Sequence, residues 1–141
     1  MSSDPSHTRG ILDTSTLIAL GRIADASVLP AQPLITTVTL AELSVGPLVV
    51  DEDSERAARQ SQLQQAEADF DPLPFDASAA RAFGRVAASL RRSRRKTSAR
   101  PYDAMIAATA IAHELPVYTC NPADFEGIDG LEVVAVPAHG E

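Results

Sequence analysis

Four acidic residues, spread across most of the chain, each stand next to a short apolar run, and together they point to metal chemistry. They are Asp13 in Gly10-Ile11-Leu12-Asp13-Thr14-Ser15, Glu42 in Leu40-Ala41-Glu42-Leu43, Asp103 in Arg100-Pro101-Tyr102-Asp103-Ala104, and Asp124 in Thr119-Cys120-Asn121-Pro122-Ala123-Asp124-Phe125. An acid among apolar residues needs a hydrogen bond, a helix-capping role or a cation, because charged groups are rarely buried without a partner. Carboxylates without His or Cys ligands favour a hard cation, Mg²⁺ or Mn²⁺.

Phosphodiester hydrolysis is the reaction that such a site serves best. A divalent cation can lower the pKa of a water, orient it for in-line attack on phosphorus and offset charge on the leaving oxygen. Other chemistries find little support, because the sequence has no Gly-x-Gly-x-x-Gly, Walker-type or Gly-x-Ser-x-Gly motif. None of the three histidines, His7, His113 and His139, is placed to be a convincing general base.

Each acid taken alone also has an ordinary structural explanation. Asp13 could cap the helix that follows it, and Asp103 could be a first-turn charge that interacts favourably with the helix dipole. Asp124 could cap a turn, and Glu42 alone would be an ordinary helix residue. The metal-site hypothesis therefore rests on the combination of the four.

The acids must be positioned by strands that alternate with helices. We expect strands at 9–12, 33–37, 73–75, 117–120 and 132–136, and helices after Asp13, from a polar cap around Thr39 with a disturbance at Gly46-Pro47, over 53–70, after the cap Asp76, and from Pro101. This alternation predicts a parallel sheet with right-handed crossovers, in which ligands collect outside the carboxyl ends of the strands. Asp13 and the turn at 121–124 should lie at that edge, within reach of Glu42 and Asp103.

Composition limits the kinds of protein that this chain can be. The 141 residues fit one domain, and a hydrophobic content of 45% is enough for a real core. Cys120 is the only cysteine, so no internal disulfide can form, which fits a reducing, cytosolic setting. No stretch approaches the length of a membrane span, and the polar residues 1–8 read as a loose arm.

Charge is distributed very unevenly along the chain. The formal net charge is −7, which argues against a general nucleic-acid binder. Eight of the 12 basic residues nevertheless fall between Asp76 and Asp103, a stretch without any acid: Arg81, Arg85, Arg91, Arg92, Arg94, Arg95, Lys96 and Arg100. This segment could face a polyanion while the remainder repels it, although an ordinary solvated helix face explains it equally well.

The four acidic motifs, taken in order, resemble those of the PIN-domain family, and within it the small VapC-type toxins of bacterial toxin–antitoxin pairs. The matching stretches are Ile11-Leu12-Asp13-Thr14-Ser15 with Leu17-Ile18, Thr39-Leu40-Ala41-Glu42-Leu43-Ser44-Val45-Gly46, Tyr102-Asp103-Ala104-Met105-Ile106-Ala107-Ala108-Thr109-Ala110, and Thr119-Cys120-Asn121-Pro122-Ala123-Asp124-Phe125. Their order and spacing cover about residues 9 to 136. One such motif would be weak evidence, but four in register are specific.

The resemblance implies an α/β, PIN-like three-layer fold, with a parallel sheet of 4–5 strands flanked by helices. It also implies an endoribonuclease toxin that depends on Mg²⁺, with Mn²⁺ as a substitute, pairs as a homodimer and is silenced by a cognate VapB-type antitoxin. We expect the nuclease domain over 9–136, between an arm at 1–8 and a tail at 137–141.

Carried over residue by residue, the resemblance assigns roles within the site. Asp13 and Asp103 correspond to the primary metal ligands, Glu42 to a further acid and Asp124 to the charged fourth position. Polar support is expected from Ser15, Thr119 and Asn121, and RNA contacts from Arg91, Arg92, Arg94, Arg95, Lys96 and Arg100. These six basic residues form the predicted basic track. Of the two aromatic residues near it, Phe83 is expected in the core, and the position of Tyr102 is left open.

Two other functions remain. The chain could be a catalytically weak or inactive PIN-like binding module, whose acidic pocket pairs with a partner protein, for example with an antitoxin arginine. A DNA nuclease is less attractive, because the chain has no room for extra helices that would clamp a duplex. Metal-dependent turnover of RNA separates the first alternative from the ribonuclease.

Overall fold

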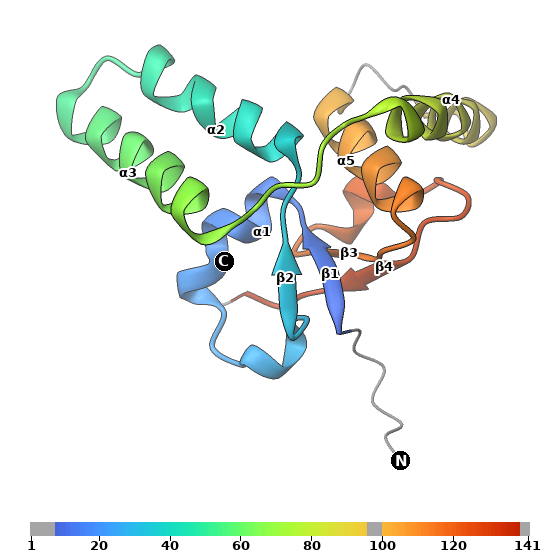
Figure 1. The fold of residues 1–141 in the computed structure, drawn as a ribbon, viewed down its shortest axis with the longest axis horizontal. Coiled ribbons are helices and arrows are strands. Elements are labelled where there is room, and N and C mark those ends of the chain that lie inside the picture. The colour runs from blue at the N-terminus through green and yellow to red at the C-terminus, as the bar shows by residue number, and fades with distance from the viewer. Residues whose placement is uncertain (1–7, 96–99, 139–141) are drawn as a thin grey trace.

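The fold is built on one sheet of parallel strands, in the order β2-β1-β3-β4 (Figure 1). A computed structural model describes residues 8–95 and 100–138. The strands are β1 (Arg9–Leu12), β2 (Gln32–Leu34), β3 (Val117–Thr119) and β4 (Val133–Ala135). Ile11 at the centre pairs with Leu34 on one side and with Val117 on the other. The predicted α/β class with a parallel sheet is therefore confirmed, with four strands.

Helices follow the strands along the chain. They are α1 (Thr14–Ile18), α2 (Thr37–Val49), α3 (Asp53–Asp69), α4 (Ala77–Arg92) and α5 (Pro101–Ala112), with 3₁₀ turns η1 (Ala19–Arg22), η2 (Ala26–Val28) and η4 (Pro122–Phe125). The Asp76 side chain caps α4 by accepting from the Ala79 amide, and Pro101 occupies the first turn of α5, both as predicted. No helix within the described ranges is long and apolar enough to cross a membrane.

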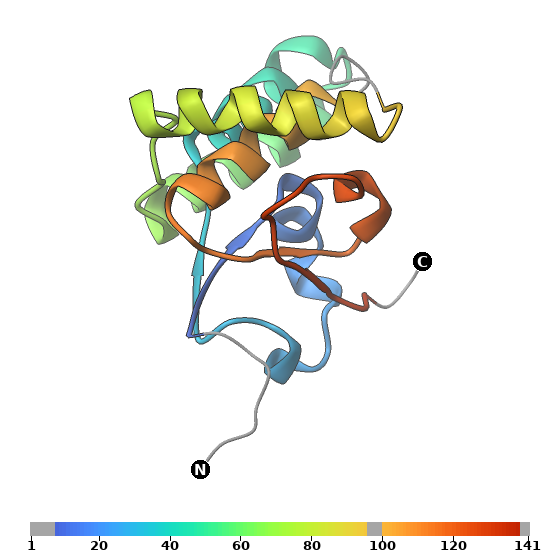
Figure 2. The same ribbon diagram turned by 90° about the vertical axis from the view of Figure 1, so that its right-hand side faces the viewer.

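Alternating side chains of the strands cover the two faces of the sheet. Ile11 and Val117 belong to a core formed with α4, α5 and η4. Leu12 and Tyr118, one position further along each strand, pack on the opposite side against residues of α1, η1 and η2. Figure 2 shows α4 lying across α5, with the strands beneath them. This arrangement gives the three-layer architecture.

Helices α2 and α3 form an antiparallel pair that extends away from the sheet (Figure 1). Their apolar stripes meet in a small core of Ile35, Leu43 and Ala66, with Leu17, Leu40, Leu63 and Phe70 packed around it. Helix α2 is therefore the packing partner of the polar helix α3.

Two local expectations were wrong. The stretch 73–75 forms no strand but one bridge between Leu73 and Thr36, because Pro72 and Pro74 remove the donors on either side. Helix α2 is capped by Thr36, whose Oγ1 accepts from the Thr39 amide at 3.2 Å, so it starts earlier than the predicted cap at Thr39. It continues through Pro47 to Val49, so the expected disturbance at Gly46-Pro47 does not end the helix, although Pro47 has no amide hydrogen to donate.

Candidate active site

Asp13 is the most rigidly held of the four acids. It follows β1 at the carboxyl edge of the sheet, caps α1 and is only 2% exposed. Its Oδ1 accepts from the amide and the hydroxyl of Thr16, and its Oδ2 accepts from Thr119 Oγ1 at 2.9 Å and from Ser15 Oγ at 3.3 Å. Donors from two neighbouring segments thus fix the carboxylate, which satisfies a buried charge.

Thr16 and Thr119 also join the ends of β1 and β3. The Thr16 hydroxyl accepts from the Cys120 amide at 2.9 Å, and the Thr119 hydroxyl accepts from the Asn121 amide at 2.9 Å. Asn121 in turn donates from its side-chain amide to Ser15 Oγ at 3.1 Å. The two chain segments that leave the sheet at this edge are therefore linked through side chains that surround Asp13.

Glu42 reaches the same edge from the second turn of α2. Its carboxylate accepts from the Thr14 hydroxyl, which lies 2.9 Å from the hydroxyl of Thr39. Burial raises the pKa of Glu42, and the nearby charge of Asp13 raises it further, while the hydrogen bond from Thr14 opposes both. Glu42 is thus partly removed from water and repelled by a second carboxylate.

Asp103, in the first turn of α5, lies in the field of the other three acids. Burial and then the charges of Asp13, Asp124 and Glu42 together raise its pKa to about 7, with Arg100 acting in the opposite direction. The four sequence-predicted acids are therefore brought together electrostatically, although they come from the N-cap of α1, from α2, from α5 and from η4.

Asp124 in η4 forms an ion pair with Arg100, at 3.1 Å between Oδ1 and Nε. Asp124 is the charged group near Asp103, whereas Asn121 is directed to Ser15. Asp124, expected as the charged fourth acid, and Asn121, expected as polar support, thus occupy different places at the site.

The donor set fits a hard divalent cation. Within residues 8–95 and 100–138, no group of three or more His, Cys, Asp or Glu side chains is arranged to hold a metal ion by itself. Mg²⁺ does not require such a cage, because it is usually bound through one or two carboxylates, waters and a substrate phosphate. Burial is the largest cause of the raised pKa of Asp103, and the repulsion from the other three acids that adds to it is the kind of interaction that a bound cation relieves.

The threonine hydroxyls around the acids were not predicted. Thr14, Thr16 and Thr39 supply hydrogen bonds to Glu42, to Asp13 and to each other. The run Thr14-Ser15-Thr16 directly after an apolar strand was a usable signal, because hydroxyl residues commonly satisfy groups at a helix N-terminus. Thr39 could not be assigned without knowing that α2 lies beside α1.

The predicted basic track divides into two parts. Arg94, Arg95 and Arg100 line a cavity of about 330 Å³ that also contacts Asp124. Arg91 and Arg92 do not line it, and Arg92 pairs with Asp129 at 2.6 Å. Lys96 lies outside the described residues.

The two aromatic residues near the track also differ. Tyr102 is 44% exposed, whereas Phe83 packs against the core and meets Phe75 edge to face. The expectation that Phe83 belongs to the core is thus confirmed. Tyr102, which was left open, lies at the surface.

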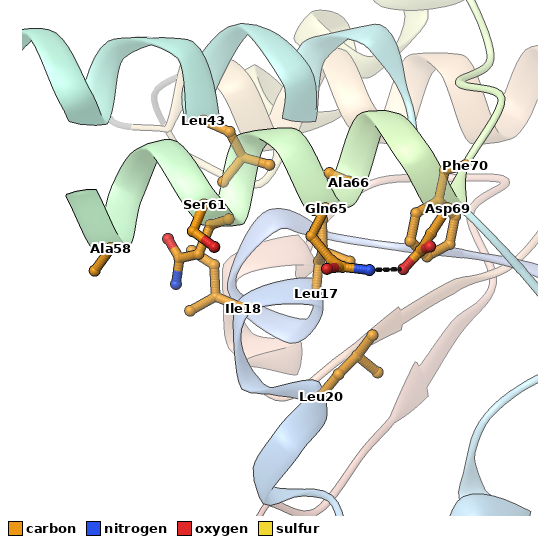
Figure 3. Close-up of a pocket in the computed structure, with 11 residues that line it drawn as sticks. Leu17, Ile18, Leu20, Leu43, Ala58, Ser61, Gln65, Ala66, Asp69 and Phe70 are labelled. Atoms are coloured by element: carbon orange, nitrogen blue, oxygen red, sulfur yellow. Dashed lines mark hydrogen bonds between the residues drawn. The ribbon is translucent and has the colours of Figure 1, made fainter. Parts of the chain in front are cut away.

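A larger apolar groove, of about 490 Å³, lies between α1 and α3 (Figure 3). Leu17, Ile18 and Leu20 form one side of it, and Phe70 and Ala66 belong to the other. None of the four acids lines this groove, so it is distinct from the acidic site.

Comparisons with known proteins agree with this architecture. A family model described as "PIN domain" matches residues 11–131. Ribonuclease VapC5 of Mycobacterium tuberculosis (strain ATCC 25618 / H37Rv) is 40% identical over 138 residues, which cover 96% of this chain and 98% of that protein. Ribonuclease VapC of Rickettsia bellii (strain RML369-C) is 32% identical over 130 residues, 90% of this chain and 96% of that protein.

A solved structure shows the same fold. The crystal structure of VapBC-5 from Mycobacterium tuberculosis, a member of the VapBC family of toxin-antitoxin systems, contains a chain that superposes with a TM-score of 0.78 at 37% identity. The superposition covers 92% of this chain and 99% of that chain. The chain therefore belongs to the PIN-domain family, among its VapC-type members.

Proposed function

We propose that this protein is an endoribonuclease toxin that depends on a divalent cation. The observation that carries the proposal is the crowding of four carboxylates at one edge of the sheet, where burial and then the charges of Asp13, Asp124 and Glu42 together raise the pKa of Asp103 to about 7. A site that stabilised only the fold would not gain from such repulsion. The names of the relatives, Ribonuclease VapC5 and Ribonuclease VapC, support RNA as the substrate.

We assign Asp13 and Asp103 to hold Mg²⁺, or Mn²⁺ as its substitute, with Glu42 and Asp124 as further acids of the site. When bound, the cation would lower the pKa of a water and offset the charge on the phosphate oxygens. Asp13 contributes a carboxylate whose orientation is fixed by Thr16 and Thr119. Asp103 must lose its proton to serve as a ligand, so cation affinity should rise with pH through about 7.

The remaining polar groups orient the reactants. Ser15 lies between Asp13 and Asn121, so its hydroxyl can hold a water or a phosphate oxygen beside the first acid. Thr14 keeps Glu42 in place through a hydrogen bond. Because positioning contributes strongly to phosphoryl chemistry, these groups belong to the working site and not only to its frame.

A VapB-type antitoxin is the proposed inhibitor. Related toxin structures have been solved as VapBC toxin–antitoxin complexes, which supports a partner of this kind. The apolar groove between α1 and α3 is a surface that an amphipathic antitoxin segment could fill, because Ile18 at its rim is 49% exposed (Figure 3). Homodimerisation and a cytoplasmic location are part of the same proposal.

The test is cleavage of total RNA by the purified, antitoxin-free chain in Mg²⁺, in Mn²⁺ and in EDTA, with the new 5′ ends mapped. Discrete cuts should require the metal and should fall by more than about 100-fold in Asp103→Asn, since even the loss of a residue that only orients a metal ligand costs about 10- to 100-fold. Asp71→Asn is the matched control, because Asp71 is an exposed acid outside the site. Equal cleavage by both variants would overturn the assignment of Asp103.

A catalytically weak or inactive binding module is the second candidate. The observation in its favour is that Arg100 already pairs with Asp124, so the acidic site can accept a guanidinium. Such a module would bind its partner with full occupancy but never cut RNA in any metal. Folded, partner-free protein that leaves RNA intact would therefore select this function.

A further inference from the structure

The cavity beside the acids is lined by both apolar and cationic side chains. Leu90, Ala104 and Ile128 are its apolar residues, and Arg94, Arg95 and Arg100 are its cationic residues. Ala104 follows Asp103 directly in α5, and Asp124 also lines the cavity, so it opens beside the proposed cleavage site. A volume of about 330 Å³ is at the lower end of the usual range for small-molecule sites and is sufficient for one nucleotide.

The three arginines differ in whether they form an ion pair. Arg95 pairs with Glu126 at 2.6 Å, and Arg100 pairs with Asp124 at 3.1 Å. None of the ion pairs within residues 8–95 and 100–138 involves Arg94. The charge of Arg94 is therefore available to an anion that enters the cavity.

The backbone of Arg94 is also unusual. Its φ of 66° is left-handed, a conformation in which glycine is preferred. Arg94 follows the end of α4, where its amide donates to the Arg91 carbonyl at 3.1 Å and the Arg95 amide donates to the Leu90 carbonyl at 2.7 Å. Glu114, with φ 55°, occupies the equivalent position after α5. Glycine could therefore replace either residue without backbone strain.

We propose that this cavity is a nucleotide subsite, which takes one nucleotide of single-stranded RNA next to the phosphate that is cut. Arg94 and Arg100 bind its phosphate, and the apolar lining residues Leu90, Ala104 and Ile128 contact its sugar or base. The proposal rests on the proposed ribonuclease function and deepens it. It also explains why Arg94, Arg95 and Arg100, and not the whole basic segment, lie at the site.

Arg94→Gly and Glu114→Gly form a matched pair, because both place glycine at a left-handed position that closes a helix. Each is introduced into the Asp103→Asn chain, so that RNA is bound without being cut. Affinity for a short fluorescein-labelled single-stranded RNA is measured by anisotropy over a range of salt concentrations. Arg94→Gly should weaken binding roughly three- to tenfold and reduce the salt slope by about 0.7, the value for one lost phosphate contact.

Three further readouts decide between the outcomes. Both glycine variants should melt at or above the temperature of their parent, and nucleoside 5′-monophosphates should compete with the RNA better than inorganic phosphate does. Equal binding by the two variants would overturn the subsite, while metal-dependent cleavage by the unmodified chain would leave the ribonuclease intact. Equal competition by inorganic phosphate would overturn the nucleotide assignment. Absence of both RNA binding and cleavage would reject the ribonuclease and the subsite together.

Discussion

At the scale of single residues, Asp103 couples the chemistry of the site to the stability of the fold. Its pKa is raised to about 7 by burial and by three neighbouring carboxylates, whereas an aspartate in an unfolded chain titrates near 3.9. Between these values the folded protein keeps a proton that the unfolded chain has released. The free energy of unfolding of the metal-free protein should therefore fall as pH rises from about 4 to 7 and stay low above that range.

Asp103→Asn should remove this penalty. In EDTA at about pH 8 we expect the variant to be more stable by on the order of 1 kcal/mol, a figure that allows for solvent screening of a partly exposed group. That corresponds to a melting temperature a few degrees higher, with little difference at about pH 4. Thermal unfolding of the variant, the parent and Asp71→Asn at both pH values measures this. A gain that did not depend on pH would show that charge repulsion is not its cause.

At the scale of elements, the N-terminal cap of α2 controls where Glu42 lies. Thr36 is fully buried and its hydroxyl accepts from the Thr39 amide, so Thr36→Ala should cost about 1 kcal/mol of stability. Because α2 carries Glu42 to the site, initial rates of RNA cleavage should also fall. Asp76→Ala removes the equivalent cap of α4 at a similar cost, but it should leave cleavage unchanged.

Melting temperatures and cleavage rates, both taken well below unfolding, separate these effects. If the two variants lost stability and activity in the same proportion, the cap of α2 would matter only for folding.

Helices whose ends carry local signals could be predicted from the sequence. Asp76 marks a helix start as a capping side chain, and Pro101 does so as a first-turn proline. The four acids were selected because each lies in a motif and the four motifs occur in the order of the PIN-domain family. The prediction of a strand at 73–75 was wrong because the apolar residues there suggested strand pairing, which Pro72 and Pro74 prevent. The contact between Thr14 and Thr39, and the left-handed backbone of Arg94, depend on tertiary packing that no local pattern encodes.

At the scale of the whole molecule, the acids converge from four distant segments, so a cation that bridges them should stabilise the entire fold. A ligand that binds only the folded state adds about 2.7 kcal/mol at 100 times its dissociation constant, which would raise the melting temperature by several degrees. The increase with Mg²⁺ or Mn²⁺ should be larger at about pH 8 than at about pH 6, because the cation must otherwise displace the proton of Asp103.

Scanning fluorimetry over a metal titration, at constant ionic strength, tests this prediction. Asp13→Asn should lose most of the increase, since it removes a carboxylate that four hydrogen bonds hold in place for a ligand. Asp71→Asn should retain it, because an exposed acid outside the site gains nothing from a bound cation. An equal increase in melting temperature in both variants would mean that the metal acts on the general negative charge of the chain. The four acids at the edge of the sheet would then not be the metal centre.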